Sequence, residues 1–253
     1  MGIKTFAPLP VTVVDVTFVR TSTLLLRFEE LTVLTDPWFC MQLRGLPCYQ
    51  RPGIELEDLP TIDLIIASHL HPDHFDRRSL SRMDLGGTNI LGPEGTARFA
   101  RDLGAKAVVD MVPGEVHKQS GVTITATEAD HPDGEVNFVL QDGSTTMFFG
   151  GDTKYHHGFT DIGRRFAIDV AMLPMGGSRV LGRRIVMTPA QALQAAVELG
   201  ARIVVPIHEG GAWMSLPPLS FHSGRPQELE QLAREREPGI EVRTLRPGEM
   251  ARF

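Results

Sequence analysis

The chain has 253 residues, a formal net charge of −6 and 42% hydrophobic residues. A chain of this length can bury a sizeable core, and we expect one domain over residues 1–253. The acidic balance offers no basic field for nucleic acid or an anionic membrane surface, so neither is an expected partner. No uninterrupted apolar run approaches the roughly 18 residues of a membrane-spanning helix. Composition therefore favours a globular protein with no membrane span.

The two cysteines, Cys40 and Cys48, are too few for a disulfide framework. The first ten residues contain no apolar run of the length found in signal peptides. We therefore expect reduced thiols and a cytoplasmic location.

Segments with β-branched or alternating residues predict strands at 11–18, 23–28 and 31–35, the last two joined by a tight hairpin. Residues 38–60 have no hydrophobic period and predict a long surface loop, either a lid or pocket wall or a simple connector. The remaining elements expected in this half are strands at 62–68, 89–92 and 107–109 and helices at 79–83 and 93–103.

The second half predicts strands first and then helices alternating with strands, as the first half does. Thr188, Pro189 and Gln191 form a helix start with an N-cap, a proline at the first position and a capping glutamine, and Gly200 ends that helix. Further expected elements are strands at 122–127, 136–140, 145–149, 168–173, 202–207, 240–245 and 250–253 and a surface helix at 227–236. The parallel between the halves indicates a duplicated α/β layout.

The densest chemical signal is His69, His71, Asp73 and His74, which directly follow the apolar strand at 62–68. Imidazole and carboxylate groups are ordinary ligands of zinc and similar ions. Crowded histidines gain nothing from one another, whereas a cation between them removes the conflict. We therefore predict a metal site where this strand ends, with Asp73 and His74 presented to a second ion about 3.5–4 Å away.

Three further residues stand where predicted strands end: His131, Asp152 and His208. Each alone is weak evidence, because a histidine or a Gly-Gly-Asp at a strand end is often only a cap or a turn. Their shared placement after apolar strands favours one common site with the histidine cluster.

These residues and their flanking segments resemble the metallo-β-lactamase superfamily. Within it the chain is similar to the branch that contains ascorbate-6-phosphate lactonase-like hydrolases and proteins of the N-acylphosphatidylethanolamine phospholipase D type. The flanking segments that carry this resemblance are Leu34-Thr35-Asp36-Pro37, Leu59-Pro60-x-Ile62-Asp63, Gly151-Asp152-Thr153, Met187-Thr188-Pro189 and Pro206-Ile207-His208.

The resemblance implies an α/β fold, a four-layer αββα sandwich with two metal ions at one edge between the sheets. It implies that His69, His71 and His131 hold the first ion, and that Asp73, His74 and His208 hold the second. It also implies that Asp152 bridges both ions. Zinc is the first expectation for the two divalent ions, with manganese or iron as alternatives.

Two departures from the branch concern the substrate. Arg20 lies in a segment where relatives often have Gly-His, and Glu209-Gly210-Gly211 stands where they often have Trp-Gly after the last ligand. Trp213, Met214 and Phe221 are candidates for an apolar pocket wall, with core packing as the alternative.

Polar residues near the predicted site are candidates for binding the substrate or for assisting its reaction. Tyr155 or His156 would donate a proton to a leaving group or bind an oxyanion. Arg179 and Arg183, with Arg184 beside them, would clamp a carboxylate or phosphate. In both cases the alternative is an exposed polar loop with no function.

We therefore expect a metal-dependent hydrolase that uses a metal-activated hydroxide on a small anionic lactone, ester or amide. The predicted catalytic residues are Asp73, Asp152 and His156, and the predicted substrate-binding residues are Tyr155, Arg179 and Arg183. The alternatives are a phosphodiesterase or nuclease of the same fold, and a non-catalytic metal-stabilised scaffold or sensor. The sequence leaves the oligomeric state open, a homo-oligomer included.

Overall fold

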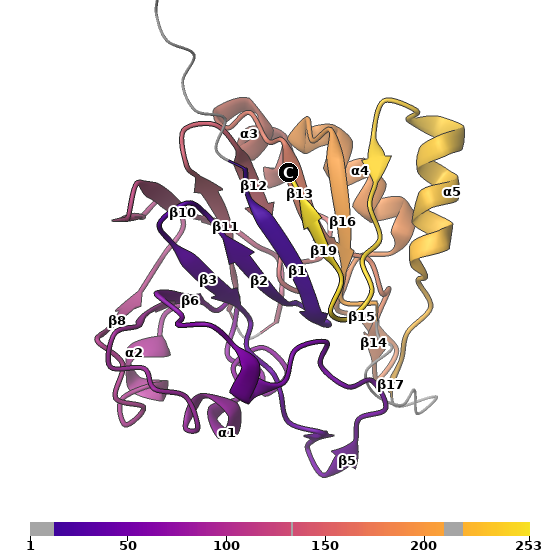
Figure 1. The fold of residues 1–253 in the computed structure, drawn as a ribbon. Helices are drawn as coiled ribbons and strands as arrows, with labels where there is room; N and C mark the ends of the chain where they lie inside the picture. The colour runs from indigo at the N-terminus through magenta and orange to yellow at the C-terminus, as the bar shows by residue number, and fades with distance from the viewer. Residues whose placement is uncertain (1–12, 133, 210–219) are drawn as a thin grey trace, which may run out of the picture.

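The computed structural model describes residues 13–132, 134–209 and 220–253. Two seven-stranded sheets lie face to face, and helices cover their outer faces (Figure 1). The predicted αββα sandwich is confirmed. Within the described residues the longest helices have 11 residues, about half of what a bilayer crossing needs.

Each sheet joins an antiparallel meander to three further parallel strands, which agrees with the predicted duplication. The first sheet has the order β19 (Met250–Arg252), β1 (Asp15–Arg20), β2 (Thr23–Arg27), β3 (Thr32–Thr35), β6 (Leu64–Ile66), β7 (Asn89–Gly92) and β8 (Ala107–Asp110). The second has the order β18 (Glu241–Val242), β16 (Ile203–Ile207), β13 (Val170–Pro174), β12 (Thr146–Phe149), β11 (Val136–Gln141), β10 (Val122–Glu128) and β9 (Val116–Gln119).

The main core lies between the two sheets. Phe18 of β1 and Leu26 of β2 belong to the same buried cluster as Phe138 of β11, Phe149 of β12 and Val205 of β16. Alternate residues of a strand point to opposite faces, so these side chains share the inner faces of the sandwich. This packing holds the carboxyl ends of strands from both sheets close together.

Helices bury the outer faces. Two short helices, α1 (Arg77–Leu80) and α2 (Thr96–Phe99), lie beside the first sheet in a cluster that includes Leu80, Ile65 and Ile90. The second sheet is covered by α3 (Gly158–Arg165), α4 (Pro189–Leu199) and α5 (Pro226–Arg236) (Figure 1).

The helix α4 forms as predicted. The Thr188 side chain accepts a hydrogen bond from the Gln191 N–H, and the Gln191 side chain accepts one from the Thr188 N–H. Gly200 ends the helix with φ 69°.

One predicted helix is shorter than expected, and two further elements were not predicted. The helix expected at 93–103 is limited to α2, because Gly95 at its N-cap has φ 98° and a helix cannot run through that conformation. The helix α3 was not predicted, since Gly158 and Gly163 lower helix propensity. A Cβ on Gly163 would lie 2.2 Å from the Glu198 carbonyl oxygen, so glycine allows α3 and α4 to pack closely. The polar edge strand β9 was also missed.

Two hairpins replace segments that we expected to be irregular. The 38–60 loop contains the 3-10 helix η1 (Leu56–Asp58) and the hairpin β4 (Gln42–Leu43) and β5 (Leu46–Pro47). The second hairpin is β14 (Arg179–Val180) and β15 (Arg183–Arg184), which pairs with β17 (Ser220–Phe221). Both turns have two residues with positive φ, Arg44-Gly45 and Leu181-Gly182, as in type I′ hairpins. Both hairpins lie at the same end of the molecule (Figure 1).

Candidate metal centre and cavity

The seven predicted ligands come together, although they follow four different strands. They follow β6, β10, β12 and β16, and their donor atoms form three groups whose members lie within 4.8 Å of one another. The groups are His69, His71 and His131; His69, His74 and Asp152; and Asp73, His74 and His208.

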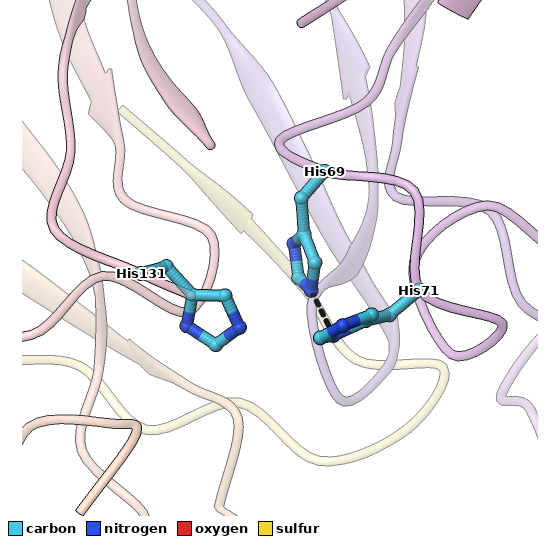
Figure 2. A group of neighbouring side chains, drawn as sticks. All are labelled: His69, His71 and His131. Atoms are coloured by element: carbon cyan, nitrogen blue, oxygen red, sulfur yellow. Dashed lines mark hydrogen bonds between the residues drawn. The ribbon is translucent and has the colours of Figure 1, made fainter. Parts of the chain in front are cut away.

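The first group consists only of imidazoles. Figure 2 shows His69 and His71 on one segment and His131 facing them from the other half of the chain. The Nε2 atom of His69 lies 2.9 Å from Nδ1 of His71. The ring centres of His69 and His131 are 4.7 Å apart. Such a three-nitrogen set is typical of zinc sites with an open position.

Asp152 lies between the histidines of the other two groups. Its Oδ1 atom is 3.2 Å from Nε2 of His74 and 3.1 Å from Nε2 of His208. The backbone N–H of His208 donates to the carbonyl of Thr21, which ties the β1–β2 turn to the site.

Asp36 orients His74 from behind, a contact that the sequence analysis did not predict. The Asp36 carboxylate lies 2.6 Å from Nδ1 of His74 and accepts from the backbone N–H of Ser68 at 2.6 Å and from its hydroxyl at 2.7 Å. Asp36 and His74 are both fully buried. A carboxylate at Nδ1 leaves Nε2 free for a metal. The signal was present as Asp36-Pro37 at the end of a predicted strand.

Glu135 supports Asp152 and was also missed. One carboxylate oxygen accepts from the Asp152 N–H at 2.7 Å, and the other lies 3.6 Å from Nδ1 of His131. Gly151, with φ 49°, makes this approach possible, because a Cβ there would lie 2.1 Å from the Glu135 oxygen and 2.4 Å from the Ser68 Cβ.

The donor atoms themselves fit a cation. His131 Nδ1 donates to the Ile185 carbonyl at 3.1 Å, which leaves Nε2 as an acceptor directed at the site. Among the described residues, Nε2 of His74, His131 and His208 and Oδ1 of Asp152 are buried and have no hydrogen-bond partner outside this set. Buried polar atoms normally have partners, and one cation would satisfy several of these at once.

The electrostatics are those of a site built for positive charge. Burial alone lowers the pKa of His74, but Asp152 and Asp36 outweigh burial and raise it well above its ordinary value. Burial favours the neutral form of Asp152, but His208 and His74 hold its pKa well below the usual range. Burial, and then Asp152, raise the pKa of Glu135. Without a metal, a proton on His74 would compensate part of the carboxylate charge that a cation would otherwise balance.

A cavity of about 680 Å³ opens onto the centre. Its polar floor contains predicted ligands, its walls are apolar, and it has two arginines, Arg44 and Arg183. The lining residues are Leu43, Arg44, His71, Asp73, His131, Pro132, Asp152, Val180, Leu181, Arg183, Ile185 and His208. The β4–β5 hairpin of the 38–60 loop therefore contributes to the wall.

Arg20 fixes the base of that loop. Its guanidinium is fully buried, stacks 3.8 Å over the Trp38 ring and donates to the carbonyls of Trp38, Cys40 and Gln50 at 2.9, 3.0 and 3.1 Å. The segment that departs from the related branch thus anchors a loop that bears Arg44.

Of the residues predicted to bind the substrate or to assist catalysis from nearby loops, some line the cavity and others do not. Arg183 lines the cavity, whereas Arg179 donates to the Gly182 carbonyl and is not among the described lining residues. Tyr155 hydrogen-bonds to Glu198 on α4, which raises its pKa to about 12. His156 packs on Phe159 with ring centres 4.4 Å apart.

Tyr155 and His156 therefore lie against α3 and α4, away from the described lining of the cavity. The catalytic role predicted for His156 gains no support from this placement. Trp213 and Met214 lie outside the described residues, and Phe221 lies in β17.

The chain belongs to the β-lactamase superfamily, because the family model described as "Beta-lactamase superfamily domain" matches residues 32–208. The superfamily expected from the sequence is confirmed. A UPF0173 metal-dependent hydrolase of Rubrobacter xylanophilus is 31% identical over 212 residues, which cover 77% of this chain and 81% of the relative. Another, from Thermus thermophilus, is 31% identical over 251 residues, or 95% and 99% of the two chains. The solved structure of Igni18, a metallo hydrolase of Ignicoccus hospitalis, has a TM-score of 0.76 at 25% identity and covers 96% of this chain and 99% of that chain.

Proposed function

We propose that this protein is a metal-dependent hydrolase that cleaves a lactone, ester or amide with the help of two divalent cations. The observation that carries the proposal is the set of buried nitrogen and oxygen atoms of His74, His131, His208 and Asp152, which converge and have no hydrogen-bond partners outside this set. The metal-dependent hydrolases among the relatives point the same way.

In this proposal each ion has three ligands of its own. His69, His71 and His131 would hold the first ion; Asp73, His74 and His208 would hold the second; Asp152 would be shared. A shared carboxylate offsets the repulsion between two cations. Zinc suits this set of nitrogen and oxygen donors, and manganese or iron would also be accepted.

Divalent cations bound here would supply a nucleophilic water near neutral pH and would polarise the oxygen of the group under attack. The protein's own residues perform the remaining tasks. Asp36 and the Ile185 carbonyl fix the tautomers of His74 and His131. Leu43 and Ile185 contribute apolar surface to the cavity lining, against which an apolar part of a substrate would pack.

The test combines metal analysis with a substrate panel. Purified protein is expected to contain up to two divalent ions per chain and to hydrolyse at least one class among chromogenic esters, lactones and amides. Full activity after exhaustive chelation would contradict metal dependence. Activity confined to phosphodiesters would replace the proposed substrate class with the phosphodiesterase alternative.

A further inference from the structure

The rim of the cavity contains two arginines that come from separate hairpins. Arg44 is the first turn residue of the β4–β5 hairpin, and Arg183 begins β15 in the other hairpin. Both side chains are exposed and both line the same cavity. Among the described residues neither guanidinium has an acidic partner, although the chain carries more acidic than basic residues.

Much of the remaining cavity lining is apolar. Leu43 and Ile185 belong to this apolar lining, and so do Val180 and Leu181 of the second hairpin. Leu181 is 74% exposed at the hairpin tip. The cavity thus combines metal-binding groups, apolar side chains and two positive charges.

We propose that Arg44 and Arg183 bind a remote carboxylate or phosphate of the substrate. The substrate class would be an acyl compound whose ester, lactone or amide bond is separated from a terminal anion by an apolar segment. Guanidinium groups bind both anions through paired hydrogen bonds and stay charged at any physiological pH. This inference rests on the proposed hydrolytic function and specifies its substrate.

A neighbouring groove extends the positive surface beyond the cavity. Arg44 lines this groove as well, together with Arg77 and Arg78. The guanidinium of Arg77 lies 5.6 Å over the Phe99 ring and has no carboxylate partner among the described residues. Three arginines against one aspartate, Asp76, leave the groove lining with a positive balance that favours the approach of anions.

The kinetic test uses a matched pair of substrates, mono-4-nitrophenyl glutarate and its neutral methyl ester. Wild-type protein is expected to prefer the anionic ester. Arg44→Gln and Arg183→Gln should each lower that preference in kcat/KM by roughly tenfold, mainly by raising KM for the anionic ester. Arg101→Gln removes the same charge from an exposed site outside the cavity lining and is the control.

A binding test separates this inference from the proposed function. Calorimetry measures the affinity of glutarate and of butyl phosphate for the chelated, metal-free protein. Weaker binding in both rim variants, but not in Arg101→Gln, supports the anion site even if no ester is turned over.

Other results would overturn the inference. Turnover of the esters with an unchanged anionic preference in the Arg44→Gln, Arg183→Gln double variant would refute it while leaving the hydrolase intact. If a single-stranded oligonucleotide binds more tightly than glutarate and butyl phosphate, and if this binding depends on Arg77 and Arg78, the proposal of a small-molecule ligand is refuted.

Discussion

The carboxylate of Asp36 provides a sharp test of how the centre is organised. Asp36→Asn preserves the shape of the side chain but replaces one acceptor oxygen with an amide donor. If its remaining oxygen keeps the bond from the Ser68 N–H, the amide faces Nδ1 of His74. His74 must then accept at Nδ1 and carry its proton on Nε2, the atom offered to the metal.

The expected cost follows from these contacts. Loss of a partner behind a ligating histidine typically weakens metal binding by about 10- to 100-fold. That range corresponds to about 1.4–2.7 kcal/mol. Removing charge-assisted hydrogen bonds from a fully buried carboxylate should also lower the free energy of unfolding by about 1–3 kcal/mol.

Asp76→Asn is the matched control. Asp76 is also buried and accepts from the backbone N–H groups of Arg78 and Cys40 at 3.1 and 3.2 Å, but it contacts no candidate ligand. Metal affinity is measured by competition with a chromophoric chelator, and stability by denaturant unfolding of the metal-free protein. Both variants should lose stability, but only Asp36→Asn should lose metal affinity. An affinity within about threefold of wild type, or an equal loss in the control, would refute the reasoning.

Further predictions concern the metal and the close packing around it. His71→Ala should lose activity and bound metal but keep its circular dichroism spectrum, since His71 is only half-buried; an active variant would contradict its role as a ligand. Asp152→Ala should lose at least one ion by elemental analysis, and full occupancy of both would show that Asp152 is not shared. Chelation should lower the Tm by roughly 10 °C if the ions are present at about a thousand times their Kd. Gly151→Ala should cost roughly 1–3 kcal/mol of stability in denaturant unfolding, because the new Cβ meets Glu135 and Ser68; an unaffected variant would show that the backbone shifts freely.

The sequence was informative where local rules act. The helix α4 carries its own capping box and stop, so its bounds followed directly. His69 to His74 follow a strand in a density that few structural roles explain. His131, Asp152 and His208 each follow a strand, so the topology of the two sheets brings them to the same place.

Contacts between distant segments were beyond the reach of local patterns. The Glu135 carboxylate accepts a hydrogen bond from the backbone N–H of Asp152, 17 residues away, and nothing in the residues that flank Glu135 indicates this contact. Tyr155 and His156 are close to Asp152 in sequence, but α3 begins at Gly158 and their side chains pack on the helical layer instead. Arg44 lies in a segment without hydrophobic period, so only the folded hairpin shows that it reaches the cavity.

The rim hairpins at 42–47 and 179–184 supply none of the candidate metal ligands. Each leaves and re-enters the scaffold within six residues and turns through its own two-residue loop. Under the proposed function, the groups that perform the chemistry and the groups that select the substrate therefore lie on separate parts of the chain. Substitutions confined to the two hairpins would then change substrate selection and leave the candidate metal ligands in place. A combinatorial library confined to these loops is the natural starting point for laboratory selection of new hydrolytic specificities.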